Sequence, residues 1–306
     1  MEDKMPVVQV EHLRKTYGSV VAVESVSFEV HRGEIFGMVG PNGAGKTTTI
    51  ECCEGIRRSD GGRVSILGMN PHADGYPLRE RIGVQLQECA LPDRLKVWEA
   101  LALFSSFYRQ PVDWRPLLEK FGLSDKHNAA FTDLSGGQKR RLFIILALIN
   151  DPELVFFDEL TTGLDPQARQ AMWALVREIQ AQDKTIFLTT HFMEEAERLC
   201  DRVAIIDQGR IIALDRPENL IRNLGAESRI VFSVDGPFSD AVLTLPAVSH
   251  IEHVGERVTV FGDGESFVGD VVNALAAAGV RFRDLRTEQP TLEDVFLKLT
   301  GREVRD

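Results

Sequence analysis

The sequence predicts an α/β protein with a mostly parallel β-sheet covered on both faces, followed by a small α+β domain. A glycine-rich segment joins a short apolar run to a helical pattern at residues 34–54, and apolar runs alternate with helical segments over residues 154–206. Strands that alternate with helices form parallel sheets. The alternation weakens between residues 216 and 225. We therefore place the first domain at residues 1–222 and an accessory or regulatory domain at residues 223–306.

Local composition assigns the elements of the first domain in chain order. Segments 7–10 and 20–30 are rich in β-branched residues and are expected to be strands separated by the turn-like Tyr17-Gly18-Ser19. The other expected strands cover residues 34–39, 64–67, 82–86, 154–157, 185–189 and 202–206. One helix is expected to begin at residue 46, and others are expected at residues 136–149, 166–180 and 194–199. A helical insert is expected at about residues 90–145 because large apolar residues recur there at helical spacing. These residues are Trp98, Leu101, Phe104 and Phe107.

The second domain mixes strand and helix patterns. Strands are expected at residues 230–234, 258–261 and 280–285, and helices at residues 266–278 and 292–299. The last helix is the most clearly specified, because Thr291 and Asp294 have capping-box spacing and Gly301 provides a stop. Its predicted apolar stripe consists of Leu292, Val295, Phe296 and Leu299. Self-association through this stripe and packing of the helix within the chain both remain open.

Length and charge exclude several classes of protein. The chain has 306 residues and a formal net charge of -11, which repels phosphate backbones, so no nucleic-acid partner is expected. The apolar run at residues 142–149 is shorter than the roughly 20 residues that span a bilayer, and the first residues lack the features of a signal peptide. A cytosolic location is therefore expected. The four cysteines lack metal-ligand spacing and are expected to be reduced thiols.

Residues 40–47, GPNGAGKT, match the pattern G-x-x-x-x-G-K-[ST] between a predicted strand and a predicted helix. The glycines let backbone N–H groups turn toward phosphate oxygens, and the helix N-terminus adds partial positive charge. Lys46 is expected to reach the terminal phosphates of a nucleotide, and the Thr47 hydroxyl to ligate Mg²⁺. The residues of this predicted phosphate site are Gly40, Pro41, Asn42, Gly43, Ala44, Gly45, Lys46, Thr47 and Thr48.

Two carboxylates, Asp158 and Glu159, follow a predicted apolar strand at the end where open α/β sheets place their ligands. Because the chain also carries a phosphate loop, Asp158 is expected to hold Mg²⁺ and Glu159 to polarise an attacking water. His191 and Gln87 follow two other predicted strands at the same kind of edge. From the residues alone, each is better explained as an ordinary surface side chain.

A second helix start also has the features of an anion site. Ser135 is a good N-cap, and Gly136 and Gly137 leave the helix N-terminus open to an anion. The alternative is a capped helix with a glycine entry. One nucleotide rarely needs two such helix starts from a single chain.

Five motifs lie in a fixed order within residues 7–216: GPNGAGKTT at 40–48, LSGGQ at 134–138, LVFFDE at 154–159, GLD at 163–165 and TTH at 189–191. Together they resemble the ATP-binding subunit of an ABC transporter, which implies a P-loop nucleotide-hydrolase fold with a helical insert. Three further segments resemble exporter ATPases of the daunorubicin/doxorubicin-resistance type. These are DELTTGLDPQAR at 158–169, THFMEEAERLCDRVAIIDQGRI at 190–211 and TLEDVFLKLTGRE at 291–303.

The resemblance implies an ATPase that forms a homodimer in its ATP-bound state. Each ATP would lie between Lys46 of one chain and the residues Ser135, Gly136, Gly137 and Gln138 of the other, which explains the two anion sites. The resemblance also gives roles to single residues: Tyr17 stacks on adenine, Gln87 contacts the metal and couples the site to a permease, Asp165 contacts the dimer partner, and His191 is the switch histidine.

The same resemblance implies a separate membrane permease, with this chain peripheral on the inner face of the membrane, and export of a hydrophobic compound such as a drug or antibiotic. The alternative is a soluble ABC ATPase that acts on ribosomes or DNA, but such proteins tend to carry two cassettes or a long coiled-coil insertion. This chain departs from the family at Leu160 and Leu86, where proline is common. Both changes free the backbone and remove no reactive group, so hydrolysis is expected to survive.

Overall fold

A computed structural model describes residues 6–301 of the chain except 88, 224–227, 235, 237 and 265. Among these residues the chain divides after Pro217 into two compact units. Each unit is described by itself.

The centre of the first unit is a six-stranded sheet with the order β5-β6-β7-β3-β8-β9. Its strands are β3 (Ile35–Val39), β5 (Ile82–Gln85), β6 (Leu154–Asp158), β7 (Thr185–Thr190), β8 (Arg202–Asp207) and β9 (Arg210–Asp215). The first five in space are parallel and β9 is antiparallel to β8. The sequence did not predict β9. It follows β8 after the two-residue turn Gln208-Gly209, in which both residues have positive φ, as tight hairpins require.

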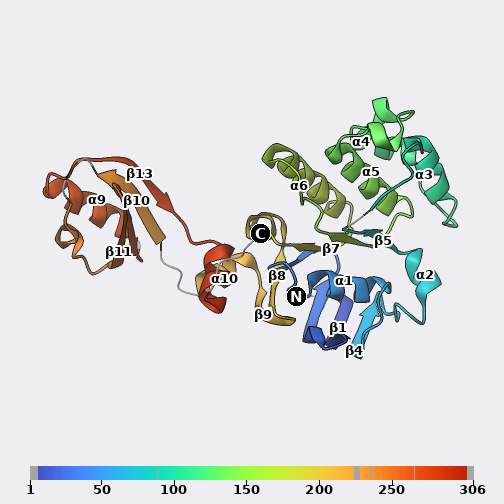
Figure 1. The fold of residues 1–306 in the computed structure, drawn as a ribbon, viewed down its shortest axis with the longest axis horizontal. Coiled ribbons are helices and arrows are strands. Elements are labelled where there is room, and N and C mark those ends of the chain that lie inside the picture. Colours follow the sequence, from blue (N-terminus) through green and yellow to red (C-terminus); the bar gives the residue numbers. More distant parts are fainter. Residues whose placement is uncertain are drawn as a thin grey trace. The chain divides into compact units, whose positions relative to one another are not determined.

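The sheet is covered on both faces, but one cover is partly a second sheet (Figure 1). Helices α5 (Gly136–Leu148) and α6 (Pro166–Gln180) lie on one face. Helix α1 (Lys46–Glu54) lies on the other, and a three-stranded sheet with the order β2-β1-β4 packs there as well. A shared core joins these layers, with Val8, Ile50, Phe156 and Phe187 among its fully buried members.

The early strands form this second sheet, whose pairing the sequence did not predict. It consists of β1 (Pro6–Tyr17), β2 (Val20–His31) and β4 (Gly61–Ile66), all antiparallel. Only Gly18 and Ser19 lie between β1 and β2, and a two-residue connection can join only antiparallel neighbours. A β-branched pattern predicts a strand without specifying its direction or partner.

The segment between β5 and β6 is helical, as expected for an insert. It contains α3 (Val97–Ser105), α4 (Trp114–Lys120) and α5, and the remaining helices of this unit are α2 (Gly75–Arg79) and α7 (Met193–Leu199). Helix α3 ends at Ser105, so Phe107 lies beyond it with 63% of its surface exposed. Three of the four residues with the expected helical spacing thus lie in α3, where Leu101 is fully buried, and Phe107 lies outside the helix.

The longest apolar run lies in α5, where Leu142 and the residues Ile144 to Leu148 are buried within the first unit. In the part of the chain that the structure describes, no helix is both long enough and apolar enough to cross a bilayer.

The second unit is a small α+β fold around a four-stranded antiparallel sheet with the order β11-β12-β10-β13. Its elements are α8 (Pro217–Asn223), β10 (Ser228–Val234), the 3-10 helix η3 (Asp240–Leu243), β11 (Val248–Val254), β12 (Arg257–Gly262), α9 (Phe267–Ala277), β13 (Phe282–Glu288) and α10 (Leu292–Thr300). The order of its strands and helices from β10 to β13 is that of a ferredoxin-like fold. Alternate residues of β10, Ile230, Phe232 and Val234, form one side of its core.

Helix α10 begins with the expected capping box between Thr291 and Asp294 and ends at Gly301 with positive φ. Leu292, Val295 and Phe296 are buried, whereas Leu299 is 42% exposed, so the expected four-residue stripe has three buried members. Because those three are already covered within this chain, they do not offer a free face for self-association.

Candidate functional site

The glycine-rich loop leaves β3 at Gly40 and enters α1 at Lys46. A Cβ atom at Gly40 would lie 2.1 Å from the carbonyl oxygen of Ile206, so no side chain fits there. Gly45 is the N-cap of α1 with a φ of 105°, a conformation that L-residues with side chains rarely adopt. The loop can therefore pass close to β8 and still present backbone N–H groups at the start of the helix.

Beside the loop lies a cavity of about 360 Å³. Part of its wall comes from the loop and α1, and the rest comes from residues distant in sequence. The lining residues are Ala22, Asn42, Gly43, Gly45, Lys46, Thr47, Thr48, Gln87 and Glu159. The structure thus brings the predicted phosphate loop, the second acidic residue and Gln87 to one place.

Lys46 is buried at the N-terminus of α1. Its Nζ donates to the carbonyl oxygens of Gly40 at 2.8 Å and Pro41 at 3.1 Å, and lies 3.5 Å from Oε1 of Glu159. Burial lowers the pKa of Lys46, and the attraction of Glu159 opposes this shift. The ammonium is therefore held at the cavity wall by the loop and by one carboxylate.

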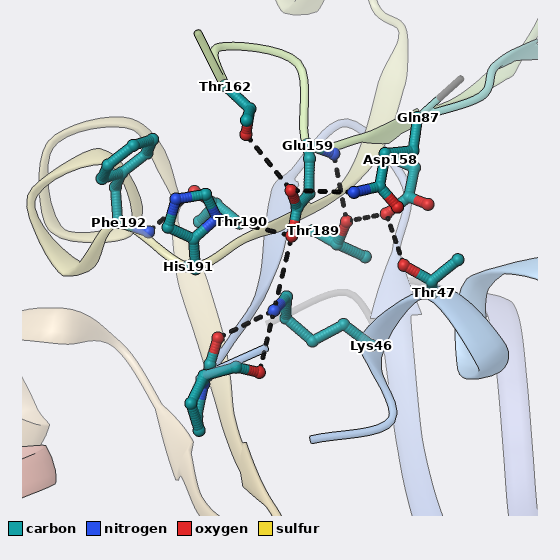
Figure 2. A network of polar contacts seen from close by, with 12 residues as sticks. Lys46, Thr47, Gln87, Asp158, Glu159, Thr162, Thr189, Thr190, His191 and Phe192 are labelled. Carbon is teal, nitrogen blue, oxygen red and sulfur yellow. Dashed lines mark hydrogen bonds and ion pairs between the residues drawn. The ribbon is translucent and has the colours of Figure 1, made fainter. Parts of the chain in front are cut away.

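Glu159 is the centre of the polar network (Figure 2). Its Oε2 accepts hydrogen bonds from Gln87 Nε2 and Thr162 Oγ1, both at 3.2 Å, and its Oε1 lies 3.4 Å from His191 Nδ1. The contact with His191, followed by the charge of Lys46, lowers the pKa of Glu159 to about 2 against the cost of burial. Glu159 is consequently a carboxylate at neutral pH.

The backbone of Glu159 is also unusual, with a φ of 50°. Its N–H donates to the carbonyl oxygen of Thr189 at 3.1 Å and lies 3.2 Å from the Thr189 hydroxyl. These contacts with β7 hold the turn that follows β6. They direct the carboxylate toward Lys46 and Gln87.

Asp158 lies next to Glu159 in a different environment. The hydroxyl of Thr47 donates to its Oδ1 at 3.4 Å, and the hydroxyl of Thr189 donates to the same oxygen. Burial raises the pKa of Asp158 although both hydroxyls lower it. A carboxylate beside a threonine hydroxyl is a pair of hard oxygen donors, which suits Mg²⁺ held together with substrate phosphates.

Other predicted residues lie outside this cavity. Ser135 and Gln138 form a capping box with each other at the start of α5, and the described cavity lining contains no residue of 135–138. Asp165 caps α6 by accepting from Ala168 N at 2.9 Å. Tyr17 is partly exposed, and the guanidinium of Arg57 lies 5.1 Å from the centre of its ring.

Two contacting residues were not singled out from the sequence. Thr162 donates to Glu159, and Thr189 donates to Asp158. Both lie within motifs quoted above. Threonine is common in strands and turns, so its presence there does not indicate a contact with a carboxylate. Their position beside the carboxylates becomes apparent only when β6 and β7 are adjacent.

Comparison with known proteins places this arrangement in a family. A family model for the ABC transporter matches residues 23–162. The Nod factor export ATP-binding protein I of Ralstonia nicotianae is 40% identical over 311 residues, covering 98% of this chain and 96% of that protein. The chain belongs to the ABC transporter family. A second relative of this ABC protein, with the same name and from Rhizobium meliloti strain 1021, is 41% identical over 305 residues and covers 98% of the chain and 89% of the relative.

Solved structures agree with the family. An ATP-binding subunit of an ABC transporter matches with a TM-score of 0.65 and 30% identity, covering 72% of this chain and 93% of that one. A nucleotide-free ATP-binding cassette from an ABC transporter matches with a TM-score of 0.62 and 27% identity, covering 72% and 94% of the two chains. This protein is therefore an ABC ATPase with a P-loop α/β fold, and it binds ATP.

Proposed function

We propose that this ABC ATPase hydrolyses ATP with Mg²⁺ in a homodimer and thereby drives a separate membrane permease that exports a hydrophobic compound. One observation carries the proposal: Lys46, Gln87, Thr162 and His191, from four separate segments, all contact the Glu159 carboxylate beside the phosphate loop.

In the proposed reaction Glu159 orients the attacking water and accepts its proton, as general bases do. Lys46 exchanges its contact with Glu159 for the phosphates, which frees the carboxylate and raises its proton affinity. His191 contacts the γ-phosphate from the end of β7. Thr47 and Asp158 hold Mg²⁺, which supplies charge neutralisation for the phosphates.

The dimer is supported by the signature segment at residues 134–138. Ser135 and Gly136 are exposed, and a Cβ built at Gly136 or Gly137 would meet nothing within 4 Å in the described chain. The fold of this chain therefore does not itself demand glycine at either position. A partner's nucleotide approaching the N-terminus of α5 would demand it, because phosphate oxygens must reach the backbone N–H groups. Asp165 and Tyr17, both exposed, would contact the partner and the adenine.

Export is supported by the relatives, whose names state Nod factor export, and by the sequence resemblance to drug-resistance exporters. These relatives align with 98% of the chain, so they extend over both units. We propose a permease as the membrane-spanning partner and the second unit as an accessory domain. We propose that the exported compound is hydrophobic.

The first experiment replaces Glu159 by glutamine. We expect hydrolysis to fall at least about 100-fold, because the general base is lost. In the presence of ATP and Mg²⁺ the variant should then accumulate as a dimer, which is measured by size-exclusion chromatography with light scattering. Glu153→Gln is the matched control at the opposite end of β6, where Glu153 pairs with Arg81 and Arg32. Wild-type turnover in the Glu159 variant, or a monomer in ATP, would contradict the proposal.

A second arm tests the partner. The chain is co-purified with the membrane protein encoded beside its gene, and ATP hydrolysis is measured in lipid vesicles with and without hydrophobic compounds. Stable association and compound-stimulated hydrolysis are expected. Absence of association would remove the permease from the proposed function.

A further inference from the structure

A third buried carboxyl group, that of Glu195 in the first turn of α7, lies behind the catalytic site and is not part of the described lining of its cavity. Its Oε1 accepts hydrogen bonds from Thr161 Oγ1 at 2.8 Å and from Trp173 Nε1 at 2.9 Å. Thr161 is also fully buried. Burying a carboxyl group is costly, and glutamate is seldom fully buried unless it is paired. The two donors offset this cost, and the contact ties α7 to α6 and to the turn after β6.

The hydrogen bond between Thr161 and Glu195 joins the same two segments as the contact between Glu159 and His191. Glu159 and Thr161 belong to the turn after β6, whereas His191 and Glu195 belong to the segment after β7. Strands β6 and β7 are parallel neighbours, so both segments leave the same edge of the sheet. One contact between two segments leaves them free to rotate about it. A second contact a few residues away also fixes their relative orientation.

The turn after β6 needs such support because of its backbone. Glu159 has a φ of 50°, a conformation that costs energy in a residue with a side chain and persists only where its surroundings fix it. The following residues are held on two sides: Thr161 donates to Glu195, and Arg140 Nη2 donates to the carbonyl oxygen of Thr162 at 3.1 Å. If the turn moved away from α7, the buried Thr161 hydroxyl would lose its acceptor, which is expensive.

We propose that Glu195 is a positioning residue of the catalytic site, which holds the turn after β6 through Thr161 and thereby fixes the Glu159 carboxylate relative to His191. The inference rests on the proposed function, since it acts through Glu159 as the general base. Displacement of a catalytic group by about 1 Å can lower a rate roughly 100-fold. A hydrogen bond outside the cavity can therefore determine the rate of hydrolysis without contacting the nucleotide.

The test uses two substitutions that separate the hydroxyl of Thr161 from its shape. Thr161→Val keeps the branched shape and removes the donor, whereas Thr161→Ser keeps the donor. Thr161→Val should lower kcat for ATP hydrolysis about tenfold and leave KM for ATP within about twofold, because the chemical step and not ATP binding depends on the turn. Thr161→Ser should recover most of the wild-type kcat. Glu194→Ala is the matched control, since Glu194 is exposed on the same turn of α7 and pairs with Arg198.

Two double variants then distinguish positioning from general damage to the fold. Glu195→Ala should lower kcat as Thr161→Val does, and the two changes together should cost no more than the larger one alone, as coupled residues do. In the Glu159→Gln background, Thr161→Val should not lower the residual hydrolysis further, because the carboxylate that it positions is absent. A purely structural role would lower hydrolysis by the same factor with or without Glu159.

The near-isosteric Thr161→Val keeps the test valid even where Glu195→Ala does not fold. Equal kcat in wild type and Thr161→Val overturns the inference, and so does an equal loss from Thr161→Val in the Glu159→Gln background. Equal hydrolysis by wild type and Glu159→Gln overturns the proposed function instead.

Discussion

Glu159 and Glu54 are both buried glutamates, with 5% and 4% of their surfaces exposed, but their surroundings differ completely. Glu159, at the phosphate cavity, contacts Lys46, Gln87, Thr162 and His191. Glu54, at the end of α1, has no hydrogen-bond partner among the described residues. The pKa of Glu159 is lowered to about 2, chiefly by His191, whereas burial raises the pKa of Glu54.

Burial by itself disfavours a charge, so the opposite shifts show which site already contains its counter-charges. At the phosphate cavity, Lys46 and His191 of the same chain surround the Glu159 carboxylate. Glu54 has no hydrogen-bond partner among the described residues. The two glutamates are therefore equally buried but differ in whether the chain itself supplies partners for a charge.

The largest expected effect in this comparison is at Lys46. Lys46→Ala should remove the proposed charge-assisted contact with phosphate, which is worth about 1.5–3 kcal/mol, so ATP affinity should fall roughly 10–100-fold. The affinity is measured by calorimetry with ATP and Mg²⁺. Lys184→Ala is the control, since Lys184 pairs with Asp151 at the surface. Unchanged ATP affinity in the Lys46 variant would show that this lysine does not contribute to phosphate binding.

A smaller effect is expected on folding stability when the pH is lowered and Glu159 becomes protonated. Its pKa is about 2 in the folded chain and 4.5 as the unperturbed value, so its stabilising contribution is complete above pH 4.5 and is lost as the pH falls toward 2. The unfolding free energy of wild type minus that of Glu159→Gln should decrease by about 2 kcal/mol between pH 6 and pH 3.

Urea unfolding followed by tryptophan fluorescence provides this measurement for the first unit, because the three tryptophans of the chain are Trp98, Trp114 and Trp173. A difference that stays constant over the pH range would mean that Glu159 is not held as a carboxylate by its neighbours.

The fold could be predicted from the sequence where the pattern is local. The strand at β3, the glycine loop and the start of α1 follow from the residues themselves, because glycine spacing and strand composition act within a few positions. The order β5-β6-β7-β3-β8-β9 and the separate β2-β1-β4 sheet depend on which strands pair at long range. Composition does not encode that pairing. Strand β11 was missed because five of its seven residues are exposed and its pattern is polar.

The residues of the candidate site also differ in how well the sequence alone could predict them. The loop and the Asp158-Glu159 pair were predicted from their own residues, while Gln87 and His191 were given roles only by the resemblance. The roles assigned to all of these residues stay predictions, although the structure places Gln87 and His191 against Glu159. Glu54 had no sequence signal, because a glutamate within a helix is usually exposed and only the tertiary fold buries it.

The smallest expected effect is the pH dependence of stability that Glu54 causes. The direction of this dependence is more informative than its size. A raised pKa means that the folded chain keeps a proton that the unfolded chain releases above about pH 4.5. Wild-type stability should therefore decline relative to Glu54→Gln as the pH rises above that value, by no more than about 1.4 kcal/mol per pH unit. Urea unfolding at pH 5, 7 and 8.5 measures the trend, which is opposite in direction to that at Glu159. A stability difference between wild type and Glu54→Gln that stays constant from pH 5 to pH 8.5 would contradict a raised pKa at Glu54.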